Sequence, residues 1–89
     1  MVDIKQLLPL GSVVTLKKGK KKIMIIGRIQ ENVNTHEAYD YAACYYPEGV
    51  IRADELFLFN QADIDMVFYV GLQDHDEFAF RAYLEETIK

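Results

Sequence analysis

This 89-residue sequence has too few cysteines for an internal disulfide bond and no apolar segment long enough to span a membrane. A single cysteine, Cys44, cannot form an internal disulfide, which is typical of a reducing cytosol. No apolar run approaches the roughly 20 residues that are needed to cross a bilayer. The N-terminal residues MVDIKQLLPLG contain an early acid and an apolar run that Pro9 breaks, so we expect no secretory signal. These features predict a cytoplasmic protein that does not bind a membrane.

Motifs of catalysis and of cofactor or metal binding are also missing. His36 and His75 lie in polar contexts without the HxxxH or HExxH spacing, and we interpret both as exposed loop histidines. Cys44 has no histidine in a recognisable local pattern and is expected to be a buried structural residue. The acidic residues within 74–77 lack the calcium-loop pattern and are better explained by helix capping. Because no nucleophile–base pair or metal set can be named, we expect no enzymatic activity and no cofactor.

The sequence does contain enough apolar residues for a core. They make up 51% of the chain, with 12% aromatic residues, which suits one domain over residues 1–89. The net charge is −4, but the charges are unevenly distributed. Residues 1–36 carry seven basic and two acidic residues (+5), and residues 37–89 carry three and twelve (−9). We therefore expect a basic corner on an acidic body, a dipole that can orient a partner.

Residues 12–30 are typical of a β-hairpin, because two β-branched apolar runs flank a lysine-rich loop. Gly19 is the residue of this loop best able to take a positive φ at the hairpin tip. Five neighbouring ammonium groups repel one another and must face water, so the loop is expected at the surface. The loop lysines are Lys17, Lys18, Lys20, Lys21 and Lys22.

The second arm of the hairpin predicts which side chains share a face. Alternation places Ile23, Ile25 and Ile29 on one face of the strand and Arg28 on the other. Gly27 leaves a gap on the isoleucine face, which suggests a bulge, a bend or a close approach of another backbone.

Further strands are expected near residues 39–46, 56–59 and 66–70, with a helical turn after Asn60. The expected fold class is α+β. It is a small, strongly bent antiparallel sheet or SH3-like barrel of about five strands, with a C-terminal helix packed on it.

The C-terminal helix is predicted over residues 74–88, with Asp74 as its N-cap. One apolar stripe of this helix should lie on the sheet, and Phe78 falls well away from that stripe. The stripe consists of Phe80, Tyr83, Leu84 and Ile88.

Two groups of residues are candidates for contact with a partner. The lysine loop suits phosphates or an acidic protein face, and its alternative interpretation is a solvated loop that discourages sheet edges from pairing. The tyrosines of residues 39–46 occupy both faces of their strand, so at least one should be exposed, and exposed tyrosine is common at interfaces. The predicted partner-binding residues are Lys18, Lys20, Lys21, Tyr45, Tyr46 and Phe78.

Three segments in a fixed order resemble a known family. They are LLPLGSVVTLKKGKKKIMIIGRIQ, YDYAACYYPEGVI and LFLFNQADIDMVFYVGLQDHDEFAF. No single motif is specific, but their order and spacing over nearly the whole chain resemble the family called domain of unknown function 4176.

The resemblance implies a function that the residues alone do not. Members of this family are encoded beside LXG polymorphic toxins of type VII secretion systems in Gram-positive Bacillota. The resemblance therefore implies that this protein is not an enzyme. It implies a targeting factor or chaperone that binds the helical LXG region of a toxin before export. Other small helical accessory proteins are further expected partners, and export together with the toxin stays open as an alternative to a cytoplasmic location.

The alternative function is a small barrel that binds nucleic acid, or another acidic partner, through the lysine loop. The calculated pI of about 5.0 disfavours nucleic acid, because nucleic-acid-binding domains usually carry a broader basic surface.

Overall fold

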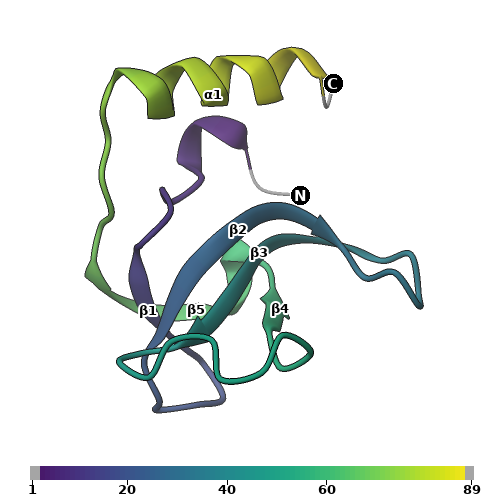
Figure 1. Cartoon of the computed structure of the whole chain (residues 1–89). Coiled ribbons are helices and arrows are strands. Elements are labelled where there is room, and N and C mark those ends of the chain that lie inside the picture. Colours follow the sequence, from purple (N-terminus) through teal and green to yellow (C-terminus); the bar gives the residue numbers. More distant parts are fainter. Residues whose placement is uncertain (1–2, 88–89) are drawn as a thin grey trace.

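The fold is α+β: among the described residues, five antiparallel strands form one sheet, and an α-helix follows them (Figure 1). The computed structural model describes residues 3–87. Its elements are η1 (Ile4–Gln6), β1 (Val13–Leu16), β2 (Ile23–Glu31), β3 (Ala38–Tyr45), β4 (Phe57–Phe59), η2 (Gln61–Asp63), β5 (Ile64–Tyr69) and α1 (His75–Thr87).

The strand order is β4-β3-β2-β1-β5. The first four strands follow one another as a meander, and β5 returns to pair with β1. β2 and β3 curve together through the sheet (Figure 1), which confirms the predicted bent sheet. Within the described residues β4 and β5 do not pair with each other, so the sheet is open and the barrel alternative is not realised.

The predicted hairpin is confirmed, since β1 and β2 pair antiparallel with Val13 opposite Met24. The prediction for Gly19 is wrong, because the glycines with positive φ are Gly11 (87°) and Gly49 (84°). A two-residue hairpin turn requires positive φ. The connection from β1 to β2 spans residues 17–22 and reverses direction without that conformation at its glycine.

A bulge interrupts β2 where the sequence suggested one. The register against β3 shifts by one residue between Ile25 and Gly27. The extra residue reverses the alternation of faces, so Arg28 opposes the core residue Tyr41 and is only 9% exposed. The prediction that Arg28 lies on the face opposite Ile25 is therefore wrong. Ile29 adopts a φ of 53° and packs against the core from a partly buried position.

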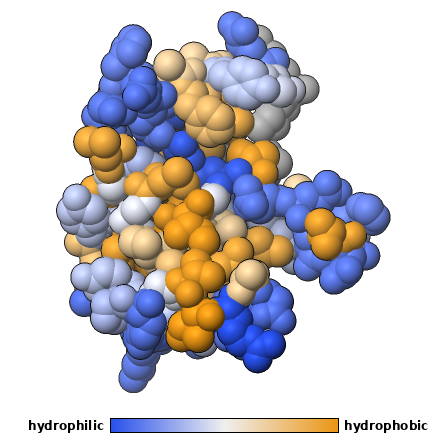
Figure 2. Space-filling model, in the orientation of Figure 1, coloured by the Kyte–Doolittle hydropathy of each residue, from blue (hydrophilic) through white to orange (hydrophobic). Residues whose placement is uncertain are grey.

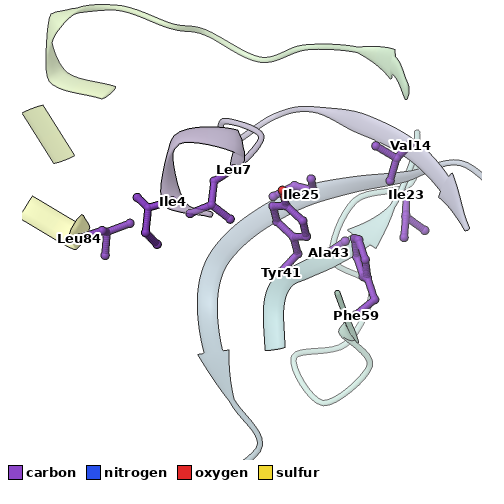
Figure 3. Close-up of a cluster of buried hydrophobic side chains, with 9 residues drawn as sticks. All are labelled: Ile4, Leu7, Val14, Ile23, Ile25, Tyr41, Ala43, Phe59 and Leu84. Carbon is purple, nitrogen blue, oxygen red and sulfur yellow. The ribbon is translucent and has the colours of Figure 1, made fainter. Parts of the chain in front are cut away.

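The core joins the sheet to the segment that precedes β1 (Figure 3). Tyr41 is fully buried, and its hydroxyl accepts a hydrogen bond from the Leu8 N–H at 2.9 Å. The same hydroxyl donates to the side-chain carbonyl of Gln61, so one tyrosine ties two distant segments to β3. The core residues are Ile4, Leu7, Val14, Ile23, Ile25, Tyr41, Ala43, Phe59 and Leu84.

Helix α1 begins as predicted, because the Asp74 carboxylate accepts a hydrogen bond from the Glu77 N–H at 3.0 Å. The helix lies over η1, which separates it from most of the sheet (Figure 1). Of the three described residues of the predicted stripe, Leu84 is buried, whereas Phe80 and Tyr83 are about half exposed, so the stripe is wrong for these two. The reason is that η1 already covers this part of the core. Ile88 lies outside the described residues.

Candidate partner-binding surface

A close backbone crossing fixes the path from β5 to α1. The Gly71 N–H donates to the Ser12 hydroxyl at 3.0 Å, and that hydroxyl donates to the Pro9 carbonyl at 2.8 Å. A Cβ atom at Gly71 would lie 1.9 Å from the Leu10 carbonyl oxygen, so only glycine fits without a backbone shift. This crossing brings Leu10 and Leu72 to one groove, although they are far apart in the sequence.

A buried ion-pair network holds α1 to the sheet. The Arg28 guanidinium donates to both carboxylate oxygens of Glu77, at 2.5 and 2.7 Å. The Arg81 Nε donates to the same carboxylate at 2.8 Å, and its Nη1 donates to the Lys5 carbonyl at 3.1 Å. The side chains of Arg28 and Glu77 are 3% and 9% exposed. The network therefore links β2, η1 and α1, and its Arg28–Glu77 pair is largely shielded from water.

The electrostatics of this network make Glu77 its centre. Burial alone would raise the pKa of Glu77, but hydrogen bonds and charge from Arg28 and Arg81 outweigh it and lower the pKa. The Nε of Arg28 is buried and has no hydrogen-bond partner among the described residues. Arg28 consequently depends on Glu77 to compensate for its desolvation.

The apolar groove beside this network has a volume of about 590 Å³. Leu10, Ile26, Leu72 and Phe80 supply its apolar lining, and the acidic residues within 74–77 border it. Leu72 is 73% exposed and the Phe80 ring lies 5.4 Å from the Arg28 guanidinium. Figure 2 shows apolar side chains gathered below α1 with hydrophilic side chains around them. Such a groove can accept the apolar side of a helix and favours basic residues at its border.

The edge strand β5 carries a second exposed apolar surface. Each residue from 66 to 70 is at least 44% exposed. Phe68 and Tyr69 both line a hollow of about 400 Å³ that Tyr46 and Met24 also line. Two consecutive side chains share this hollow because the register against β1 shifts there. The Lys22 ammonium lies 4.7 Å from the centre of the Phe68 ring.

The predicted partner-binding residues lie in three separate places. Lys18, Lys20, Lys21 and Tyr45 line one hollow of about 320 Å³ beside the lysine loop. Lys21 is partly engaged there, because its ammonium lies 2.8 Å from a Glu48 carboxylate oxygen.

The other two predicted residues lie apart from the lysine loop. Tyr46 is exposed and lines the hollow at the β5 edge. Phe78 is exposed on α1, with the Arg81 guanidinium 5.9 Å from its ring centre. The structure thus does not unite the six predicted residues in one surface.

The cysteine and the two histidines, which were considered as possible ligands or catalytic groups, all lie in the described part of the chain. Cys44 is buried, as predicted. His36 and His75 are both exposed, and the Nδ1 of His36 lies 3.3 Å from a Glu31 carboxylate oxygen. The loop prediction is wrong for His75, which is the first residue of α1 because the helix begins directly after its cap at Asp74. No group of three or more metal-ligating side chains is found among residues 3–87.

Sequence reasoning missed the apolar groove and the β5 edge. The run Met66 to Val70 carries no polar alternation, and such a run is typical of a buried strand. Its exposure follows from its place at the end of the sheet, which the pattern does not encode. Leu10 and Leu72 likewise meet only through the backbone crossing at Gly71.

The family model described as Domain of unknown function (DUF4176) matches residues 7–80. The chain belongs to the DUF4176 family. The match includes every strand and the start of α1, together with all residues that line the apolar groove. No curated protein and no solved structure matches this DUF4176 chain significantly. None of the helices in the described part of the chain has the length and apolar character that crossing a bilayer requires.

Proposed function

We propose that this DUF4176 protein is a non-catalytic accessory protein that binds the helical LXG region of a type VII-secreted toxin in the cytoplasm. Membership of the family supports the proposal, since the resemblance described above implies a targeting factor or chaperone. The structural observation that carries it is the exposed apolar groove between α1 and β2.

The groove has the chemistry of a site for an amphipathic helix. A helix presents apolar residues at spacings of three and four, and exposed anchors such as Leu10, Leu72 and Phe80 can pack against them. Full burial of one large apolar side chain contributes about 1.5–3 kcal/mol, so a few anchors suffice for a stable complex. Asp74 and Asp76 at the border favour a helix with basic residues beside its apolar stripe.

Co-expression with the LXG region of the neighbouring toxin tests the proposal. We expect the two proteins to elute together in size-exclusion chromatography at micromolar concentration. The double variant Leu10→Asp/Leu72→Asp should weaken the complex at least about tenfold, because both side chains are exposed and would place charge in the groove.

The matched control is Val33→Asp, a substitution of an exposed apolar residue in the β2–β3 loop. It should leave the complex unchanged. Separate elution of the wild-type proteins would contradict the proposed function. An unchanged complex with the double variant would show that the groove is not the binding surface.

Binding of nucleic acid or another acidic partner through the lysine loop is the alternative function. Lys18 and Lys20 are exposed and available for phosphates, but Lys21 is paired with Glu48 and Lys22 lies over Phe68. The alternative predicts a low-salt complex with DNA or RNA that fails when Lys18, Lys20 and Lys21 become alanine.

A further inference from the structure

The hollow beside the lysine loop has an apolar floor that four strands build together. Each of β1, β2, β3 and β4 contributes the residue at one of its ends. The floor residues are Leu16, Ile23, Tyr45 and Phe57. The Tyr45 and Phe57 rings pack edge to face, with their centres 4.9 Å apart. The curved sheet thus gathers four strand ends around a space of about 320 Å³, a volume at the lower end of ligand-binding pockets.

The rim of this hollow is positively charged. Lys18, Lys20 and Lys21 line it, and all three are exposed. Within residues 3–87, neither Lys18 nor Lys20 forms an ion pair. Gly19 lies between them, and a Cβ atom there would meet nothing within 4 Å beyond its two neighbours in the chain. The mouth of the hollow is therefore open, and two of its cations are available to an acidic partner.

The third lysine shows which chemical group the rim attracts. The Lys21 ammonium lies 2.8 Å from a Glu48 carboxylate oxygen and 5.9 Å from the centre of the Tyr45 ring. The rim thus already holds one carboxylate beside an aromatic residue of the floor. Both side chains of this ion pair are 46% exposed, so the carboxylate of a partner can compete for Lys21.

We propose that this hollow binds an acidic peptide segment that presents one aromatic side chain. The aromatic ring enters the hollow and packs on Tyr45 and Phe57, because aromatic rings favour edge-to-face and offset contacts. The carboxylates on either side of the ring pair with Lys18 and Lys20 at the rim. The hollow and the apolar groove share no lining residue, so this inference does not rest on the proposed toxin binding.

A peptide suits this hollow better than a nucleic acid for two reasons. Phosphates would contact the lysines and leave the apolar floor uncovered, whereas an aromatic side chain covers it. Residues 37–89 carry three basic and twelve acidic residues (−9), which repel an extended polyanion more than a short segment with a few carboxylates. An apolar floor with a cationic rim therefore favours a ligand that is both acidic and aromatic.

A titration of the isotope-labelled chain, followed by nuclear magnetic resonance, tests this proposal. The probe is an acetylated and amidated peptide with one phenylalanine between three glutamates on each side. We expect a dissociation constant of about 1 mM or below at physiological salt, with shifts concentrated at the floor residues and the lysine loop. The same peptide with glycine in place of phenylalanine should bind at least about tenfold more weakly, because it buries no ring. No shifts at several-millimolar peptide, or equal affinity of the two peptides, would overturn the proposal.

Two pairs of lysines in the same loop test whether the rim is specific. Lys18→Glu/Lys20→Glu reverses the two free charges of the rim and should weaken the peptide complex at least about tenfold. Lys17→Glu/Lys22→Glu is the matched control, because both side chains are exposed outside the hollow and the net charge changes equally. It should weaken the complex about threefold or less, since salt screens charges away from the contact. Equal losses would overturn the proposed site, with circular dichroism confirming that both variants fold.

Glu48→Gln tests the carboxylate preference in the opposite direction. It removes the charge that occupies Lys21 and keeps a side chain of similar size. Because Lys21 then has no competing carboxylate, the peptide should bind about two- to threefold more tightly. Weaker binding would contradict the competition for Lys21.

Two further titrations separate this site from the other proposed activities. A single-stranded oligothymidylate that binds more tightly than the peptide, and that both lysine pairs weaken equally, would overturn the proposal in favour of nucleic acid. The groove variant Leu10→Asp/Leu72→Asp should leave peptide affinity unchanged. Peptide binding by a chain that does not bind the LXG region overturns only the proposed function, and the reverse result overturns only this inference.

Discussion

The two edges of the sheet are built in opposite ways. β4 has three residues and directs aromatic rings inward: Phe59 is buried 5.4 Å from the Tyr41 ring, and Phe57 lies 4.9 Å from the Tyr45 ring. β5 has six residues, and its Tyr69 is 62% exposed. Edge strands are usually short or protected. The difference indicates that β4 completes the core of the fold, whereas β5 exposes apolar side chains at the opposite edge of the sheet.

Truncating one aromatic residue at each edge should give the largest difference in the free energy of unfolding. Phe59→Ala should lower the free energy of unfolding by about 3–5 kcal/mol, since it empties a buried site against Tyr41. Tyr69→Ala at the exposed edge should change it by about 0.5 kcal/mol or less. Urea unfolding followed by circular dichroism measures both values. Equal losses at the two edges would contradict the comparison.

On the side of the molecule that carries the groove, the Arg28–Glu77 ion pair holds α1 in place more than aromatic packing does. Glu77→Ala should lower the free energy of unfolding by about 2–4 kcal/mol, because it leaves the buried Arg28 guanidinium without its carboxylate. Glu48→Ala removes an exposed ion pair with Lys21 and is the matched control, with a far smaller expected loss. Similar values for the two variants, measured in urea, would mean that the buried network does not hold α1.

A substitution at Gly71, in the backbone crossing between β5 and α1, should cause the next largest loss in the free energy of unfolding. Gly71→Ala should cost about 1–3 kcal/mol, because its Cβ would collide with the Leu10 carbonyl oxygen. Gly19→Ala lies in open space and should be nearly neutral. Thermal unfolding of the two variants compares them directly. A neutral Gly71→Ala would contradict the close approach that brings Leu10 and Leu72 together.

Acidification should loosen the attachment of α1 by a smaller amount. The pKa of Glu77 is lowered in the folded chain from its ordinary value of 4.5, so the unfolded chain binds more protons between the two values. The stability that Glu77 contributes is therefore complete above pH 4.5 and is lost as the pH falls through its folded pKa. Denaturant unfolding from pH 6 to pH 3 should show a shallower decline for Glu77→Gln. A decline parallel to wild type would contradict this role.

Local signals in the sequence predict much of the fold. Asp74 caps the helix as expected, and Gly27 marks the bulge of β2. The consequence of that bulge is not local, because one additional residue moves Arg28 to the core side and so towards Glu77. The position of α1 over η1 is equally non-local, and it leaves Phe80 exposed beside the groove.

The candidate surfaces are less predictable than the fold for a related reason. An exposed apolar strand and a buried one have the same composition, so the sequence of residues 66–70 does not indicate that these side chains are exposed. Lysines and tyrosines are readily proposed as binding residues because their charge or hydroxyl group can be recognised in the sequence. Of the six predicted partner-binding residues, only Tyr46 lines the hollow at the β5 edge. Surfaces that depend on strand order and on a backbone crossing require the structure.

Hydrogen–deuterium exchange of the chain, free and with the LXG region of the neighbouring toxin, tests the central claim most directly. We expect protection on binding to appear at Leu10 and over residues 72–80, with no change in the loop that contains Val33. Protection confined to the lysine loop, or no protection at all in a mixture of the two proteins, would contradict it.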